Sequence, residues 1–179
     1  MGYRHSREEI LEGAIAAVFA EGLSRLTFGA LARRLGISDR IVVYYFPTKD
    51  DLVGAVLGAI GGQLQAALGP ALADPVRDHF AFVEAVWPTL ARRKADPVFA
   101  VYFEASGLAA VGVEPYRSMA AGLVDGWITW AEQSIAGDAE RRRTEAVAAI
   151  AVLDGLLLLR QLAGPETAER AANGIQRRS

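Results

Sequence analysis

The sequence predicts an all-α protein of about nine helices. Capping residues and proline or glycine breaks recur along the 179 residues, with apolar residues at helical spacing between them. No stretch shows the alternation of apolar and polar residues between hairpin turns that is typical of half-buried strands. With 52% apolar residues and a net charge of −2, the chain is apolar enough and long enough to bury a substantial core.

The first four predicted helices are the best delimited. Each begins at a hydroxyl side chain that can accept a hydrogen bond from a free backbone N–H group, and the first two end at glycine. The first start is a capping box, because a glutamate follows the serine three residues later. The predicted caps are Ser6, Thr27, Ser38 and Thr48, and the predicted glycine ends are Gly22 and Gly36.

Proline and glycine separate the remaining helices. An aspartate directly before a proline predicts a helix start, because the carboxylate caps the helix and the proline fits its first turn. Such pairs occur at 74–75 and 96–97, and weaker breaks occur at 114–115, 137–138 and 164–165.

Composition argues against several classes of protein. The absence of cysteine excludes disulfides and thiolate metal sites, and two histidines without metal-ligand spacing predict no metal site. We find no nucleophilic triad and no phosphate-binding glycine loop, so we expect neither catalytic residues nor a cofactor. The first residues lack the apolar core of a secretory signal, and the most hydrophobic run, 146–159, is too short to span a membrane. We therefore expect a cytoplasmic protein with no membrane partner.

Residues 26–53, LTFGALARRLGISDRIVVYYFPTKDDLV, place a short helix, a glycine-containing turn and a second short helix in succession. This is the arrangement of a helix-turn-helix, whose second helix lies in the DNA major groove. The segment resembles the N-terminal DNA-binding domain of the TetR family of bacterial regulators, and the resemblance runs from residue 7 to about residue 55. Its framework positions are Phe19, Gly22, Thr27, Leu31, Ala32, Leu35, Gly36, Ser38, Phe46, Lys49 and Leu52.

The resemblance implies a three-helix DNA-binding domain, residues 1–47, joined through a long fourth helix to a helical effector-binding and dimerisation domain, residues 48–179. It implies a ligand-responsive transcriptional repressor that binds a palindromic operator as a homodimer. A small, largely apolar or aromatic effector would release it from the double-stranded DNA. The residues themselves leave two alternatives open. One is a helical small-molecule enzyme or carrier with an incidental helix-turn-helix, and the other is a DNA-binding protein with a filled core and no effector.

Eight residues in and around the predicted third helix are candidates for DNA contacts. Arg40 can pair with a guanine through its planar guanidinium, or it can be a surface residue paired with Asp39. Hydroxyl and backbone N–H groups at helix N-termini bind phosphates, and a lysine at the start of the fourth helix adds a positive charge. The predicted contacts are Thr27, Ser38, Asp39, Arg40, Ile41, Val43, Tyr44 and Lys49.

Three aromatic residues in a row, 44–46, cannot all face one core, because neighbouring side chains on a helix point about 100° apart. We expect Tyr44 to be exposed and to reach a phosphate or a thymine methyl group. We expect Tyr45 to pack between helices and Phe46 to close the small N-terminal core. The alternative is that both tyrosines only seal that core. Val43 stands where the family pattern usually has a tyrosine that touches the DNA backbone.

Nine of the fifteen aromatic residues lie between Phe80 and Trp130, including all three tryptophans. Together with the family resemblance, this clustering predicts a cavity for a small effector, although the same residues also suit an ordinary core. Two glutamates there have apolar helical neighbours. Each can receive a polar group of a ligand, or pair with Arg92, Arg117 or His79 inside the fold. The predicted ligand-binding residues are Phe80, Glu84, Trp87, Tyr102, Phe103, Glu104, Trp127 and Trp130.

Residues 144–164, TEAVAAIAVLDGLLLLRQLAG, resemble the penultimate helix of the family, which builds a four-helix bundle across a twofold axis with the last helix. A helix that is apolar nearly all round must be covered on every side, and a second copy of the chain can supply part of that cover. An ordinary buried helix is the alternative. The predicted dimer seam consists of Ala148, Ala149, Val152, Gly155, Leu156 and Leu159.

Overall fold

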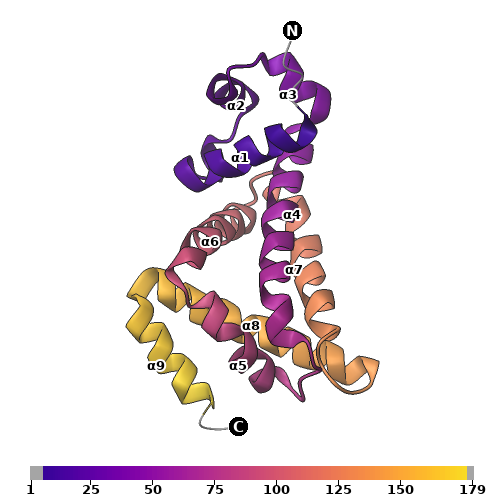
Figure 1. Ribbon diagram of the computed structural model, residues 1–179, viewed down its shortest axis with the longest axis vertical. Coiled ribbons are helices and arrows are strands. Elements are labelled where there is room, and N and C mark those ends of the chain that lie inside the picture. The colour runs from indigo at the N-terminus through magenta and orange to yellow at the C-terminus, as the bar shows by residue number, and fades with distance from the viewer. Residues whose placement is uncertain (1–5, 177–179) are drawn as a thin grey trace. The chain divides into compact units, whose positions relative to one another are not determined.

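The structure is a computed structural model, and it describes residues 6–176. Within these residues the chain forms nine α-helices, three short 3-10 helices and one isolated β-bridge, which confirms the predicted all-α class (Figure 1). The α-helices are α1 (Arg7–Glu21), α2 (Phe28–Leu35), α3 (Asp39–Tyr45), α4 (Lys49–Leu68), α5 (His79–Leu90), α6 (Asp96–Ala110), α7 (Tyr116–Glu132), α8 (Ala139–Ala163) and α9 (Pro165–Gln176), and the 3-10 helices are η1 (Leu23–Arg25), η2 (Gly69–Leu72) and η3 (Arg93–Ala95).

The chain divides into two compact units. Unit 1 contains Met1–Gln63 and Val101–Met119, and unit 2 contains Leu64–Ala100 and Ala120–Ser179. Helices α1 to α3 lie wholly in unit 1, and α5, α8 and α9 lie wholly in unit 2. Unit 1 therefore includes a segment from the middle of the chain in addition to its N-terminal residues. The predicted domain boundary between residues 47 and 48 stays a prediction.

Local capping explains the helix ends in unit 1. The capping box at α1 is confirmed, because the Ser6 hydroxyl accepts from the Glu9 amide and the Glu9 carboxylate accepts from the Ser6 amide. The Thr27 hydroxyl accepts from the Ala30 amide at 3.1 Å and starts α2. Gly36 then ends α2 in the left-handed conformation, at φ 67°, which a residue with a side chain adopts only with strain.

The core of unit 1 is made by apolar residues at helical spacing. Ile10, Ala14 and Val18 form the buried stripe of α1, while α2 contributes Leu31 and Ala32. Helix α2 packs against both α1 and α3. The remaining buried side chains from α3 and α4 and the turn between them are Val42, Phe46, Leu52, Val53 and Val56.

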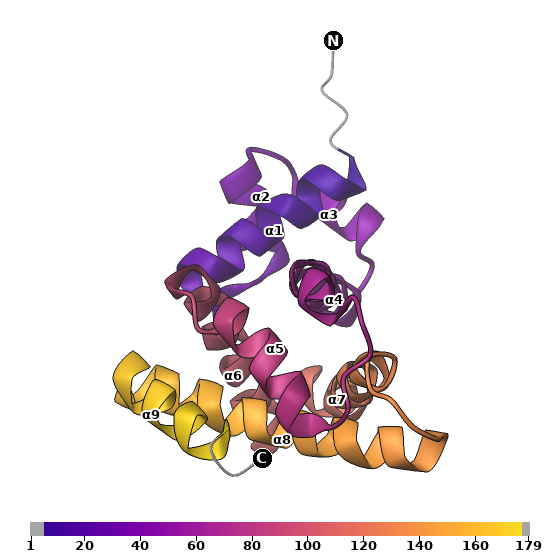
Figure 2. The same cartoon turned by 60° about the horizontal axis from the view of Figure 1, so that its bottom comes forward.

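Unit 2 is organised around α8, the longest helix. Helix α5 packs against α8, and α9 turns back beside it (Figure 2). The buried side chains of α5 include Phe82 and Trp87, and those of α8 include Leu153 and Leu157. Helix α9 packs against α8. Two of its small residues, Ala168 and Ala172, are buried.

The predicted helix start at residues 74–75 is wrong. Val76 instead forms an isolated β-bridge with Ile135, in which the Val76 amide donates to the Ser134 carbonyl at 2.8 Å. Helix α5 begins at His79, where the Asp78 carboxylate accepts from the Ala81 amide at 2.9 Å. The backbone pairing of Val76 with the segment at Ile135 keeps this part of the chain out of a helix, so the cap of α5 comes from Asp78 instead.

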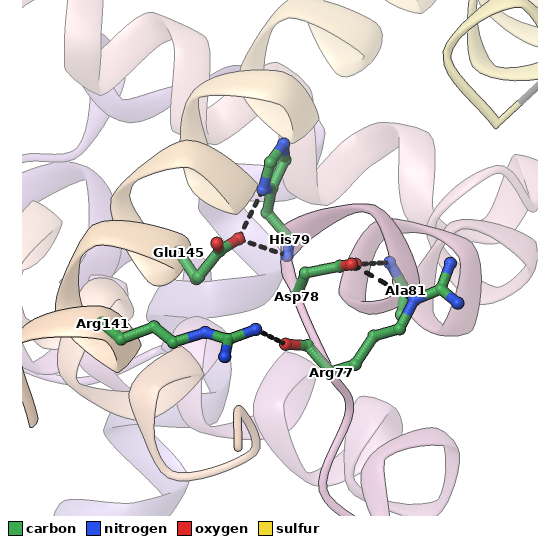
Figure 3. Close-up of polar contacts among 6 residues, drawn as sticks. All are labelled: Arg77, Asp78, His79, Ala81, Arg141 and Glu145. Atoms are coloured by element: carbon green, nitrogen blue, oxygen red, sulfur yellow. Dashed lines mark hydrogen bonds and ion pairs between the residues drawn. The ribbon is translucent and has the colours of Figure 1, made fainter. Parts of the chain in front are cut away.

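A polar cluster holds the start of α5 against α8 (Figure 3). One oxygen of Glu145 accepts from the His79 backbone amide at 2.8 Å and contacts the His79 ring nitrogen Nδ1 at 2.5 Å. The Arg141 guanidinium donates to the Arg77 carbonyl at 3.1 Å. The backbone N–H and the ring of His79 both favour the charged carboxylate, so they hold the pKa of Glu145 below its ordinary value.

Two segments, Lys49–Leu72 and α8, are long and apolar enough to cross a membrane by length and composition. Core helices of soluble proteins pass the same test. Both segments bury apolar residues inside the fold, Leu52 and Val56 in the first and Leu153 and Leu156 in the second. Each segment therefore contributes part of its apolar surface to the core, with 28% and 33% of the two apolar windows buried.

We predict that Glu145→Gln lowers the free energy of unfolding at neutral pH by about 1.5 kcal/mol, because hydrogen bonds to a carboxylate are stronger than those to an amide. The folded-state pKa of Glu145 is lowered, so its contribution is present above the ordinary carboxyl pKa and is lost as pH falls through the lowered value. Urea unfolding of parent and variant should therefore converge in acid. The exposed Glu84→Gln is the matched control, and an equal difference at all pH values would contradict this role for Glu145.

Candidate nucleic-acid interface

The turn between α2 and α3 is built by the backbone. After Gly36 ends α2, the Ile37 amide donates to the Ala32 carbonyl at 3.0 Å and fixes the exit of the chain. Ser38 is the N-cap of α3 and is exposed. Two short helices joined by three residues, with the second helix partly exposed, make the helix-turn-helix arrangement that the sequence predicts.

One face of α3 is exposed and carries groups that can recognise DNA. Asp39, Arg40, Val43 and Tyr44 are exposed and follow helical spacing, while Val42 is fully buried behind them. A guanidinium pairs with base edges, methyl groups contact thymine, and a phenol donates to phosphate. The fifth predicted contact on this helix, Ile41, is half-buried.

The aromatic run 44–46 divides between solvent and core as predicted. The Tyr44 side chain is 77% exposed, whereas Phe46 is 1% exposed. Tyr45 is half-buried and its ring lies edge-on to that of Tyr44, with centroids 4.9 Å apart. The Arg7 guanidinium lies 4.9 Å from the centroid of the Phe46 ring, at a distance typical of cation–π contacts.

Polar groups flank the exposed face of α3. Within the described part of the chain, the Ser38 side chain makes no capping hydrogen bond, so its hydroxyl is available to a phosphate. Thr27 is exposed and already caps α2 through its oxygen. Lys49 is exposed in the first turn of α4, where Thr48 and Asp51 cap the helix reciprocally at 3.0 Å.

Glu104, a predicted ligand contact, accepts hydrogen bonds from the turn between α1 and α2, and its contact with an effector stays a prediction. Its Oε2 accepts from the Leu23 amide at 2.8 Å and its Oε1 accepts from the Ser24 amide at 2.9 Å. Partial burial raises the pKa of Glu104, but the backbone N–H groups of Ser24 and Leu23 outweigh this effect and hold the pKa below its ordinary value. Its partners are thus backbone groups of unit 1 rather than Arg92, Arg117 or His79.

The other predicted ligand-binding residues fall in both units. In unit 2, the Trp127 and Trp130 rings meet edge-on at 5.6 Å, and the Trp87 indole donates to Glu169 at 3.0 Å. Phe80 is half-buried there, and Glu84 is exposed on α5. In unit 1, the rings of Tyr102 and Phe103 meet at 5.1 Å. Their convergence on one effector cavity stays a prediction.

An open hollow of about 850 Å³ lies in unit 2 between the C-terminal end of α5, α8 and α9. None of the eight predicted ligand-binding residues lines it. Arg160 reaches it from α8 and is held by Asp96, with Nε and Oδ1 2.6 Å apart, while Glu166, Glu169 and Arg170 line it from α9. Four of its eight lining residues are charged and none is aromatic.

Helix α8 presents an exposed apolar stripe that differs from the predicted dimer seam. Ala149 and Leu156 are buried inside unit 2, at 0% and 2% exposed, so the chain itself already covers them. Ala148 and Val152 are half-buried, and Gly155 and Leu159 are exposed. The exposed face is rotated by roughly 80° about the helix axis from the predicted one, at 100° per residue. This exposed α8 stripe consists of Val147, Ala151, Gly155, Leu158, Leu159 and Leu162.

Comparisons with known proteins agree with this geometry. Residues 10–56 match the sequence profile of a family described as "Bacterial regulatory proteins, tetR family". None of the curated proteins matches this sequence. The matched segment contains most of α1, all of α2 and α3, and the first turns of α4.

Solved structures resemble the chain over nearly its whole length. A TetR transcriptional regulator from Legionella pneumophila is 22% identical, with 99% of both chains covered and a TM-score of 0.63. A transcriptional regulator from Rhodococcus sp. Rha1 is 22% identical over 97% of this chain and 95% of that chain, with a TM-score of 0.70. These matches confirm the fold, an N-terminal helix-turn-helix domain followed by a helical C-terminal domain.

The multidrug binding protein EbrR is similar in two complexes. In the complex with imidazole it is 27% identical, with 99% of this chain and 93% of that chain covered and a TM-score of 0.70. In the complex with proflavin it is 26% identical, with 96% and 98% covered and a TM-score of 0.68.

We predict that Tyr44→Ala changes the free energy of unfolding by no more than about 0.5 kcal/mol, because an exposed side chain loses little packing. Phe46→Ala should cost about 3–5 kcal/mol through the cavity that it leaves in the core of unit 1. Urea unfolding followed by circular dichroism measures both. A comparable loss for the two variants would show that Tyr44 serves the core and is not available to a partner.

Proposed function

Because this chain belongs to the TetR family of bacterial transcriptional regulators, which are not enzymes, we propose that it is a repressor of transcription. It binds a palindromic operator in double-stranded DNA as a homodimer and is released by a small, largely apolar or aromatic effector. It acts in the cytoplasm, where the DNA is, and requires no cofactor. The observation that carries this proposal is the exposed face of α3.

The DNA contact follows from the chemistry of that face. Arg40 lies in the first turn of α3, where a side chain of a recognition helix reaches base edges. Val43 and Tyr44 lie one turn later and suit a thymine methyl group and a phosphate oxygen. Ser38 and Lys49 flank them with a hydroxyl and a positive charge for the backbone.

The homodimer is supported by the exposed α8 stripe. Four large apolar side chains of this stripe are between 39% and 78% exposed, and they lie on one face of a single helix. A second copy of the same stripe, related by a twofold axis, would cover it with groups of the same chemistry. A palindrome with half-sites one duplex turn apart, about 34–36 Å, requires two copies of α3, and a twofold dimer would supply them.

The effector is suggested by two features. EbrR, about a quarter identical to this chain, was solved with imidazole and with proflavin, which are both planar aromatic compounds. The predicted ligand residues here include three tryptophans and three other aromatic side chains, which suit such molecules. An effector that binds the DNA-free state more tightly must weaken DNA binding by the same factor by which DNA weakens effector binding.

Selection from a random-sequence duplex pool tests the proposal directly. The parent protein should retain palindromic duplexes, and a gel shift with them should show one complex that contains two chains. Titration with proflavin then tests release, which should accompany quenching of tryptophan fluorescence. Retention of no duplex would contradict DNA binding, and retention without release by any planar aromatic compound would contradict the effector.

We predict that Arg40→Ala weakens binding to the selected palindrome by about 1–3 kcal/mol and relaxes the preference at one base pair in each half-site. Arg40→Lys should not restore binding fully, because an ammonium lacks the planar fork that pairs with guanine. Fluorescence anisotropy measures the affinities. Arg117→Ala removes the same charge from an exposed position of unit 1 and serves as the control. An equal effect of the two alanine variants would exclude a base contact by Arg40.

We predict that the double variant Leu158→Arg, Leu162→Arg is monomeric, because it places two charges in each copy of the exposed α8 stripe. Leu162 is 78% exposed, so the protomer should keep its helical content and most of its stability. Light scattering measures the mass in solution. Val111→Arg, at a position 76% exposed in unit 1, is the matched control and should stay dimeric. A dimeric double variant would place the dimer contact elsewhere.

A further inference from the structure

The connection between α1 and α2 is held by a carboxylate from far along the chain. Glu104, on α6, accepts from two successive backbone amides, Leu23 at 2.8 Å and Ser24 at 2.9 Å, with one oxygen for each. All three residues belong to unit 1. Leu23 and Ser24 lie within the predicted DNA-binding domain, residues 1–47, in the turn that leads into the helix-turn-helix, whereas Glu104 lies outside that domain.

This connection requires an acceptor from elsewhere. Helix α1 ends at Glu21, and η1 begins two residues later with free backbone N–H groups. Gly22 precedes η1 and has no side chain that could cap it. The Glu104 carboxylate supplies the missing cap, as an aspartate or serine would at an ordinary helix start.

The contact is also close and directional. Gly22 has φ +88°, and a Cβ atom built there would lie 2.9 Å from Oε2 of Glu104, so the carboxylate occupies the space that a side chain would need. On the carbonyl side, the buried Tyr116 hydroxyl lies 3.4 Å from the Leu23 oxygen and can donate to it. Glu104 thus accepts hydrogen bonds from two N–H groups of the turn, and Tyr116 can donate one to a carbonyl group of the same turn.

The first turn of α6, which lies in unit 2, has hydrogen bonds of its own to α8. At the first residue of α6, Asp96 receives two hydrogen bonds from the Arg160 guanidinium, at 2.6 and 3.2 Å. The Gln161 side chain donates to the Asp96 carbonyl at 2.9 Å. These contacts hold the first turn of α6 within unit 2.

We propose that Glu104 is a positioning residue for DNA recognition, an inference that rests on the proposed function. Its carboxylate fixes the turn Gly22–Ser24, from which the chain enters α2 through the buried Leu26. Helix α2 packs against α1 and α3, so the position of the turn sets the orientation of the exposed face of α3. Glu104 touches the backbone of the turn, and it contributes to DNA binding only through that turn.

The test compares Glu104→Gln with Glu114→Gln. Both remove one negative charge from unit 1, and both carboxylates accept from backbone amides, but Glu114 accepts within its own helix start, from Ser118 at 3.1 Å. Glu104→Gln should bind the palindrome selected by the parent about tenfold more weakly, as expected for loss of a hydrogen bond to a charged group. Glu114→Gln should bind like the parent.

Three further readouts separate positioning from general destabilisation. The ratio of affinities for the palindrome and for a duplex with one half-site should fall in Glu104→Gln, because a palindrome requires both α3 helices to be placed at once. The salt dependence should keep its slope, because no phosphate contact is lost. Amide exchange at Leu23 and Ser24 should accelerate. Glu104→Asp keeps the charge but is one methylene shorter, and it should bind with intermediate affinity.

The outcomes are distinguishable. If the parent selects no duplex, the proposed function fails. If the parent binds and the two glutamine variants bind equally well, only the inference about Glu104 is overturned. A loss of affinity in Glu104→Gln that is equal for the palindrome and the half-site, with a matching fall in melting temperature, would reduce Glu104 to a residue that stabilises the fold and would overturn its role in positioning.

Discussion

The recognition surface depends on helices that are too short to be stable alone. Helix α2 has 8 residues and α3 has 7, and isolated helices shorter than about 12–15 residues are marginal in water. Their order comes from burial of Val42 and Phe46 against the core of unit 1, and from the fixed entry of the chain into α2. The exposed face of α3 is therefore held in place only because the opposite face is packed. The packing of Val42 and Phe46 decides which side chains of α3 point to solvent.

Features governed by neighbours in sequence could be predicted well. The caps at Ser6 and Thr27 and the glycine ends at Gly22 and Gly36 depend on a few adjacent residues, and the structure confirms them. The division of the run 44–46 between solvent and core followed from helical geometry alone. The failure at residues 74–75 has a physical cause as well. A local cap signal was present there, but a backbone pairing between Val76 and Ile135, distant in sequence, overrode it.

Features governed by distant residues could not be predicted. Nothing near Glu104 indicates that its partners are the amides of Leu23 and Ser24, because those amides belong to a turn about 80 residues earlier. The exposed side of α8 was misplaced for a related reason. In a helix that is apolar nearly all round, the spacing of apolar residues does not show which face is buried. In α8 the buried face, which includes Leu156, depends on where α5 and α9 pack.

The exposed face of α3 and the exposed α8 stripe have different proposed roles in DNA recognition. The first would contact the DNA, and the second would join two copies of the chain. The exposed face of α3 offers four side chains, which can discriminate among only a few base pairs and give modest affinity to a single copy. The exposed α8 stripe has no chemistry that reads a base, but it can join two copies. When one α3 of a dimer is bound, the other α3 is held near the DNA at a high effective concentration. The affinities of the two half-sites then combine, and the recognised DNA sequence is twice as long. In the proposed dimer a change in the orientation of α3 would occur in both copies, so we expect residues that orient α3 to influence binding as well as those that touch DNA.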